Sequence, residues 1–198
     1  MKKKVLIGIV LLCLVGVILF FIFGKNAENS LGDVVGTTDN TTYELRSYTT
    51  SKTFYMTGPK GYKYDEDSTG TWNSKAVFDK SNKMDTSLTY SFVSSEMDKY
   101  FESRKKSRYE ECLDSDYYKN LTWQDKKTLT VNGNEITYVK VTYNDSSTYY
   151  NNIYSMATVH GWKICCEITQ DGETNSFESD SKLLKDAWEI SFTDEDDI

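Results

Sequence analysis

An uninterrupted apolar run near the N-terminus constrains this chain more than any other feature. Val5–Phe23 holds 19 residues without a charged side chain. As a helix rising about 1.5 Å per residue, the run would span about 28 Å, close to the thickness of a bilayer's hydrocarbon core. Three lysines precede it, whereas only Lys25 follows closely. Because positive charge favours the cytoplasmic side, we expect a single-pass signal anchor in the plasma membrane, with the N-terminus inside and the C-terminal domain extracellular.

A cleaved signal peptide and a lipoprotein signal are the alternatives to an anchor. A signal peptide has a shorter apolar region followed by small residues, whereas this run ends in the bulky segment Phe20–Phe23. Cleavage further on, near Ala27, stays open. A lipidated cysteine follows a small residue, but Cys13 follows Leu12. We therefore expect residues 1–24 to contain the cytoplasmic lysines and an uncleaved membrane helix.

The anchor separates two stretches of very different charge. Residues 1–25 hold four lysines and no acidic residue, so residues 26–198 carry 19 basic and 30 acidic side chains, a net charge of −11. Such a domain repels nucleic acid and anionic lipid headgroups, which bind through clustered Lys and Arg. The basic run Arg104–Arg108 is short and flanked by acidic residues. We interpret it as the solvated face of a helix and expect no nucleic-acid partner.

Beyond the anchor, the chain divides into a spacer, one folded domain and a tail. Residues 25–42 are small and polar, which is typical of a flexible spacer. Residues 43–193 form the expected domain, and the aromatic content of 14% favours a packed core over disorder. Residues 194–198 form an acidic tail.

Alternating apolar residues and turn signals predict a series of strands in the domain. Asn132-Gly133 and His160-Gly161 are expected to close two hairpins, because these residues tolerate positive φ. A Gly-Pro turn at Gly58–Gly61 follows the first strand. The predicted strands cover residues 53–57, 76–79, 87–93, 128–131, 135–143, 149–159, 162–169 and, as a short closing strand, 189–192.

Helical spacing predicts two helices among these strands. The first has Ser95 as its N-cap and ends within 113–118, and the second begins at the N-cap Asn175 with Glu178 three residues later. The order of elements predicts an α+β fold, with a mainly antiparallel β-sheet and packed helices. The packing faces are expected to carry Met97, Tyr100, Phe101, Arg104, Arg108 and Cys112 in the first helix, and Phe177, Leu184 and Trp188 in the second.

This order of elements resembles the PsbP/Mog1-type α/β/α sandwich. The likeness depends on the strand and turn Phe54–Tyr62 and on the terminal helical segment Leu184–Trp188, which ends in Trp. It covers about residues 45–193. The resemblance implies a non-catalytic module with an assembly, docking or accessory role, and it carries no functional residue over to this chain.

Little in the sequence points to catalysis. The single histidine, His160, lies in a predicted turn beside Gly161, which fits a positive-φ residue better than a catalytic base. No nucleotide-binding or nucleophile-elbow motif occurs in the sequence. Asp65–Gly70 begins like a calcium loop, but position 12 would be Ala76, where that loop requires Glu. We expect no catalytic residue, cofactor or dedicated metal site, with a weak calcium site as the alternative for Asp65–Gly70.

Three cysteines lie in the expected extracellular domain. On the predicted strand 162–169, Cys166 shares a face with apolar residues, whereas Cys165 lies on the face of charged neighbours. Cys112 lies on the packing face of the first helix. An oxidising exterior allows a disulfide, and Cys112–Cys166 is the pair whose faces agree in character. Three reduced thiols are the alternative.

Paired tyrosines are the remaining candidates for a binding surface. Exposed aromatic rings anchor protein partners and stack on sugar rings, whereas tyrosine also fills the faces of half-buried sheets. The candidates are Tyr117, Tyr118, Tyr149, Tyr150 and Tyr154.

These features favour a membrane-anchored extracytoplasmic binding or accessory module without catalytic activity. It would act through contacts with an envelope protein or the cell wall. One alternative is an extracytoplasmic hydrolase that uses carboxylates. Another is the ectodomain of a membrane sensor, which would need a partner in the membrane because only Met1–Lys4 remain in the cytoplasm.

Overall fold

In the computed structural model, all the elements described below lie within Asn40–Ile198. The predicted anchor, most of the predicted spacer, Tyr117 and the last four residues of the predicted tail lie outside the described residues. None of the described helices is long and apolar enough to cross a bilayer. The structure describes residues 41–47, 52–68, 74–81, 84–113 and 118–194.

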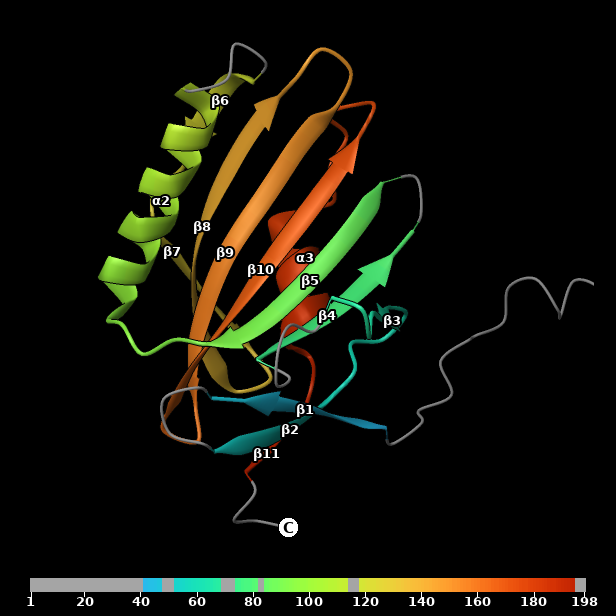
Figure 1. Cartoon of the computed structure of the whole chain (residues 1–198), viewed down its shortest axis with the longest axis vertical. Coiled ribbons are helices and arrows are strands. Elements are labelled where there is room, and N and C mark those ends of the chain that lie inside the picture. Colours follow the sequence, from blue (N-terminus) through green and yellow to red (C-terminus); the bar gives the residue numbers. More distant parts are fainter. Residues whose placement is uncertain (1–40, 48–51, 69–73, 82–83, 114–117, 195–198) are drawn as a thin grey trace, which may run out of the picture. The chain divides into compact units, whose positions relative to one another are not determined.

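The larger sheet contains eight of the described strands, and all its neighbouring strands are antiparallel. Its longest strands, β8, β9 and β10, have 11 residues each and lie side by side. β6 and β7 both pair with β8 and follow one another along that edge. In pairing order the strands are β3 (Lys63–Tyr64), β4 (Lys75–Lys80), β5 (Asp85–Phe92), β10 (Trp162–Gly172), β9 (Tyr149–Val159), β8 (Asn134–Asn144) and β6 (Lys119–Trp123), with β7 (Lys127–Val131) also on β8 (Figure 1).

A second, three-stranded antiparallel sheet joins the two ends of the described chain. β2 lies in its centre, between β1 and β11. Leu45 and Met56 are fully buried, and both belong with Phe192 to the core that the larger sheet also lines. The strands are β1 (Thr42–Arg46), β2 (Thr53–Thr57) and β11 (Phe192–Asp194).

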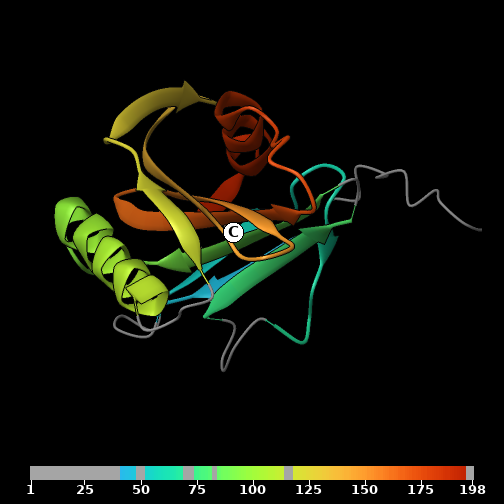
Figure 2. The ribbon, with the colours of Figure 1, turned by 90° about the horizontal axis from the view of Figure 1, so that it is seen from above.

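Two helices cover opposite faces of the larger sheet (Figure 2). They are α2 (Met97–Leu113) and α3 (Asp180–Trp188). The larger sheet separates two hydrophobic cores, and two neighbouring residues of β10 lie in different ones. Cys166 packs in the core that contains α3, whereas Cys165 packs in the core beneath α2. The central strands are therefore buried on both faces, as expected for a sheet with a helix on each side.

Both predicted hairpin turns are confirmed. Asn132 and Gly133 have φ values of 50° and 79°, and His160 and Gly161 have 50° and 80°. Two consecutive residues with positive φ match the right-handed twist of the strands that they connect. The turns therefore fix the register of β7 with β8 and of β9 with β10.

The second helix begins later than predicted. Its N-cap is Ser179 rather than Asn175, and the Ser179 hydroxyl accepts the backbone N–H of Lys182. Phe177 consequently precedes the helix instead of lying on its buried face. The prediction failed because Asn175 and Ser179 are both good capping residues, and only the packing of Trp188 against the sheet selects between them.

The predicted fold class is confirmed as an α+β domain with a mainly antiparallel sheet. The strands β1, β3 and β6 escaped prediction because they are short and only partly buried. The domain boundaries also differ by one residue at each end. β1 includes Thr42 from the predicted spacer, and β11 includes Asp194 from the predicted tail.

Candidate functional site

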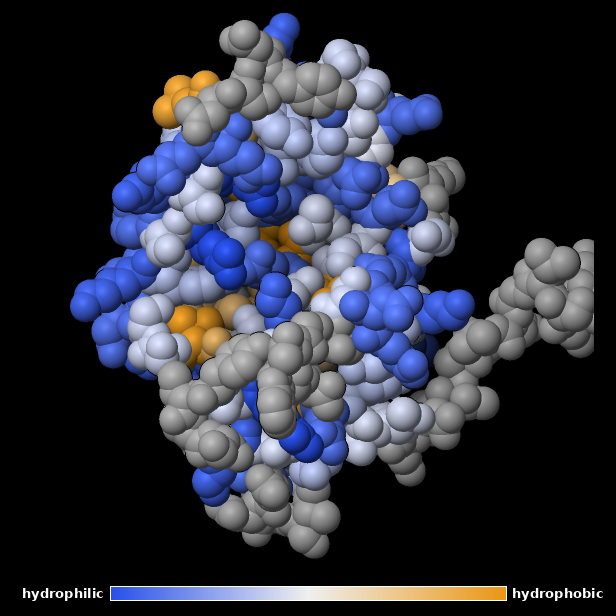
Figure 3. Space-filling view, in the orientation of Figure 1, coloured by the Kyte–Doolittle hydropathy of each residue, from blue (hydrophilic) through white to orange (hydrophobic). Residues whose placement is uncertain are grey.

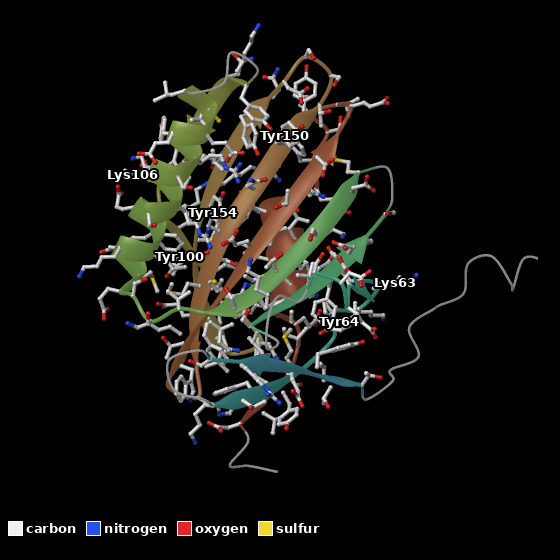
Figure 4. All side chains as sticks on the ribbon, in the orientation of Figure 1. Lys63, Tyr64, Tyr100, Lys106, Tyr150 and Tyr154 are labelled. Atoms are coloured by element: carbon white, nitrogen blue, oxygen red, sulfur yellow. The ribbon has the colours of Figure 1, made fainter. Side chains whose placement is uncertain are left out.

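α2 carries two arginines on the side that faces the sheet. Arg104 and Arg108 are one helical turn apart and therefore point in the same direction. Tyr100 lies one turn earlier and is 6% exposed. Tyr143 of β8 and Tyr154 of β9 face α2 from the sheet. We call these five side chains the arginine–tyrosine cluster, in which Figure 4 labels Tyr100 and Tyr154.

Arg108 is held by both tyrosines of the sheet. Its Nη2 and Nε donate to the Tyr154 hydroxyl at 3.0 and 3.3 Å, and its Nη1 donates to the Tyr143 hydroxyl at 3.1 Å. Glu111 lies 2.7 Å from Nη1 on the more exposed side. The prediction of a solvated basic run is therefore wrong for Arg108, because the hydroxyl groups of the sheet bind its guanidinium.

Arg104 is likewise directed toward the sheet. It forms an ion pair with Glu167 of β10, and its guanidinium carbon lies 5.4 Å from the ring centre of Tyr100. Burial opposes the charged form of Arg104, but the charge of Glu167 raises the pKa of this arginine overall. Each arginine of the cluster thus has an acidic partner, so the cluster holds no uncompensated positive charge.

Two tyrosines of the cluster, Tyr100 and Tyr143, are protonated at neutral pH. Burial raises the pKa of Tyr100 well above its ordinary value. Burial also raises the pKa of Tyr143, although Arg108 and a hydrogen bond with Asn152 act in the opposite direction. These hydroxyl groups therefore keep their protons and remain hydrogen-bond donors as well as acceptors.

Asn152 of β9 is a buried polar residue beside the cluster. It is 2% exposed and lies between Thr169 of β10 and Val141 of β8. Its side-chain carbonyl oxygen has no hydrogen-bond partner among the described residues. A buried amide oxygen without a partner costs about 1–3 kcal/mol. It is therefore an acceptor that can bind a donor from a ligand or from water.

Beside α2, the same face of the sheet is polar. Ser87 of β5, Thr169 and Asn152 are neighbours across three strands, and Thr89 pairs with Glu167 one row away. α2 packs on β6 and β9, and no described helix covers β5 and β4 on this face (Figure 1). Figure 3 shows a hollow beside α2 with polar residues around it. We call this region, with the cluster as its wall and the two rows as its floor, the α2 groove.

The tyrosines predicted as a binding surface have different environments. Tyr154 is 3% exposed beneath α2, so its prediction as a surface aromatic is wrong. Tyr118 and Tyr150 are partly buried, with ring centres 5.9 Å apart. Tyr149 is 39% exposed, and Tyr117 lies outside the described residues.

The structure contradicts the predicted disulfide between Cys112 and Cys166. The three described cysteines are free thiols. Cys112 packs beneath α2, whereas Cys166 lies in the core on the opposite face of the sheet. Both cysteines lie on apolar faces, as predicted, but these faces belong to two different cores. A helix covers each side of the sheet, so the sheet separates the two thiols. Cys165, predicted on a charged face, is fully buried for the same reason.

The other candidates of the sequence have structural roles. The Nε2 atom of His160 lies 3.2 Å from the backbone oxygen of Phe192, so the hairpin turn contacts β11. The carboxylate of Asp65 accepts the backbone N–H of Asp67 at 3.0 Å, which forms a local turn. The described residues include no group of three or more His, Cys, Asp or Glu side chains placed to hold a metal ion.

The arrangement of the elements defines the class of fold. An antiparallel sheet lies between two helices, and a small second sheet completes the domain. Among solved structures, cyanobacterial PsbP (CyanoP) from Synechocystis sp. PCC 6803 is similar, with a TM-score of 0.45 and 11% identity over 83% of this chain and 99% of that chain. LpqN, described as involved in cell envelope biogenesis of Mycobacterium tuberculosis, is similar with a TM-score of 0.40 and 10% identity over 77% of this chain and 91% of that chain.

The PsbP type that the sequence resembles recurs among these matches, and at such identities and TM-scores nothing further about this chain follows from them. No protein-family profile matches the chain. No curated protein is significantly similar to it.

Asn152, Thr169 and Ser87 were missed as site residues at the level of sequence. A signal for the first exists, because Asn151 and Asn152 interrupt a strand whose next residues are nearly all buried. No signal identifies the two hydroxyl residues, since Ser and Thr at alternate positions are ordinary on any exposed strand face. Their alignment with Asn152 depends on the pairing of β5, β10 and β9.

Proposed function

We propose that this chain is a membrane-anchored extracytoplasmic binding module without catalytic activity, and that the α2 groove is its binding surface. Residues 1–24 would form the anchor and residues 25–41 the spacer, since Thr42 begins β1. The lysines before Val5–Phe23 support an orientation with the domain outside. The module would then act on an envelope protein or cell-wall component close to the membrane.

The unpaired oxygen of Asn152 is the observation that carries this proposal. Buried polar groups in folded domains nearly always have partners, and the exceptions point to a bound water, ion or ligand or to a functional group. Three side chains among the described residues have such an atom, namely Tyr62, Asn151 and Asn152, and the oxygen of Asn152 is the one that lies where the floor of the α2 groove meets its wall. The wall is rigidly organised by the contacts of Arg108 and Arg104 with the sheet.

The chemistry of the nearby nucleophile favours binding over catalysis. The Sγ atom of Cys165 lies 3.1 Å from the Oγ atom of Ser91. Burial raises the pKa of Cys165, so it is a thiol rather than a reactive thiolate at neutral pH. His160, the single histidine of the chain, lies in the β9–β10 turn and contacts Phe192 instead of this thiol.

A cross-linking pull-down from intact membranes tests the binding role. The full-length chain is compared with the double variant Ser87→Ala, Thr169→Val and with the control Thr130→Val, which removes an exposed hydroxyl on β7. We expect a reproducible adduct that the double variant loses and the control keeps. Equal adducts from both variants, or no reproducible adduct from the wild type, would contradict the proposal.

Protease added to intact cells tests the orientation. We expect digestion of the domain from outside, with a short membrane fragment left behind. Full protection in intact cells, followed by digestion after lysis, would show that the domain faces the cytoplasm.

A further inference from the structure

The side chains of the α2 groove indicate what kind of ligand it binds, an inference that rests on the proposed function. We propose that the groove binds a neutral, polyhydroxylated chain, that is, a glycan segment without charged groups. Three properties of the groove support this ligand: its charge balance, its mixture of donors and acceptors, and the spacing of its hydrogen-bonding side chains.

The charge balance disfavours anionic ligands. Arg104 is paired with Glu167, and Arg108 with Glu111, so neither guanidinium is available as a free cation. The domain as a whole is strongly acidic, with a net charge of −11 over residues 26–198. An anionic polymer would therefore be repelled, and a phosphate would have to displace a carboxylate from its arginine.

The floor of the groove offers donors and acceptors together. The partly exposed hydroxyl groups of Ser87, Thr89 and Thr169 can each donate and accept a hydrogen bond. The unpaired oxygen of Asn152 can only accept, and because it is buried beside Thr169, a ligand reaches it only if the neighbouring side chains move. A sugar hydroxyl also donates and accepts, so it can satisfy either kind of group. A peptide segment would instead require a regular ladder of backbone groups, which this floor of side chains does not provide.

The spacing of the floor suits an extended chain of small rings. Ser87, Thr169 and Asn152 lie in one row across β5, β10 and β9, and Thr89 and Glu167 lie in the next row on β5 and β10. Adjacent strands are about 4.8 Å apart, so each row presents a polar group at roughly that interval. Successive sugar units along a row could therefore each meet one hydrogen-bonding side chain.

An acidic row lies at one end of the floor. Asp171 pairs with Asp85 across β10 and β5, one row beyond Thr169. Burial and the charge of Asp85 raise the pKa of Asp171. These carboxylates add acceptors for sugar hydroxyls and add to the repulsion of anionic chains.

Titration of the full-length chain with defined oligosaccharides tests the proposal. The chain is placed in nanodiscs of zwitterionic lipid, because maltoside detergents themselves carry sugars. Calorimetry then measures binding of maltohexaose, cellohexaose and the hexamer of N-acetylglucosamine, with oligogalacturonate as the anionic comparison. We expect saturable binding of at least one neutral hexamer and none of the anionic one.

Variants locate the site. Thr169→Val removes one hydroxyl without changing the shape of the side chain. It should weaken binding about tenfold, because the sugar hydroxyl that bonds to Thr169 then has no partner in the complex. Thr130→Val, on the distant edge strand β7, should have no effect. Thermal unfolding of both variants confirms that each is folded.

Three results would overturn the glycan proposal. They are failure of all neutral hexamers to bind, equal binding by Thr169→Val and wild type, and preferred binding of the anionic oligosaccharide. If no hexamer binds but membranes still give an adduct that depends on the groove, the ligand is a protein and the proposed binding function stands. If neither assay detects a groove-dependent partner, both proposals fail.

Discussion

Arg108 should contribute substantially to the stability of the domain, although it belongs to a basic run on a helix. Its guanidinium donates three hydrogen bonds to the hydroxyl groups of Tyr143 and Tyr154, which are 6% and 3% exposed. Arg108→Met keeps most of the apolar stem but leaves both buried hydroxyls without their charged partner. At about 1–1.5 kcal/mol for each hydroxyl, the free energy of unfolding should fall by about 2–3 kcal/mol.

The exposed contact of Arg108 with Glu111 adds little to this figure. Glu111 is 49% exposed, and such pairs contribute less than about 1 kcal/mol. Lys106→Met provides the matched control, because Lys106 lies on the same helix with a side chain 76% exposed and an acidic partner four residues later. This control should change stability by less than about 0.5 kcal/mol.

Urea unfolding of the unit 40–198, followed by tryptophan fluorescence, measures both variants. Adding Tyr143→Phe and Tyr154→Phe to Arg108→Met should recover part of the loss, because no buried hydroxyl then lacks a partner. A loss for Arg108→Met no larger than that for Lys106→Met would show that the basic run is solvated, as its sequence first indicates. It would refute the arginine–tyrosine cluster as the organiser of the groove wall.

Three further results follow from the described contacts. Ser155→Ala should lower the free energy of unfolding by about 1–3 kcal/mol, because the Ser155 hydroxyl accepts a hydrogen bond from the indole N–H of the fully buried Trp188 at 3.0 Å. An unchanged urea midpoint would contradict this expected loss of stability. Asp171→Asn should stabilise the domain slightly at neutral pH, because burial and the charge of Asp85 raise the pKa of Asp171. This gain should disappear as the pH falls through that raised pKa toward the ordinary value of about 4, where the wild-type carboxyl is also neutral, and a gain that persists in acid would point to another cause. The unit 40–198 should migrate identically on reducing and non-reducing gels and show three titratable thiols under denaturant, whereas a faster non-reduced band would reveal a disulfide.

The sequence predicted the turns better than the helix ends. Asn132-Gly133 and His160-Gly161 each place two residues at positive φ, which few residue types tolerate, so the local signal is strong. The start of α3 has no comparable signal. Asn175 and Ser179 both favour capping, and the choice depends on which start lets Trp188 reach its partners across the sheet.

Assignments to the faces of the strands failed where they required tertiary information. Alternation correctly placed Cys166 in an apolar core, but it could not reveal that Cys165 also lies in a core, because that depends on where α2 packs. The same missing information produced the incorrect pair of Cys112 with Cys166. For the same reason the sequence could not decide whether Tyr154 forms a binding surface or fills a face of the sheet, and the structure shows the second.

The groove itself could not be predicted from the sequence. Its floor combines Ser87 of β5 with Thr169 and Asn152, which are brought together by pairing between strands that are far apart in the chain. Its wall requires Arg104 and Arg108 to point inward, as their helical spacing on the predicted packing face indicates, although the charged sequence around them also suggested a solvated run. The sequence could not show which groups of the sheet these two arginines contact.

Site-specific photo-cross-linking in intact membranes tests the central claim most directly. A photoreactive residue is placed at Ser87 on the floor of the groove or at Lys185, an exposed position on α3 on the other side of the sheet. We expect the full-length chain to form a reproducible adduct from position 87 and to lose this adduct with Thr169→Val, while position 185 gives none. Adducts of equal yield from both positions, or an adduct from position 185 alone, would contradict the assignment of the α2 groove as the binding surface.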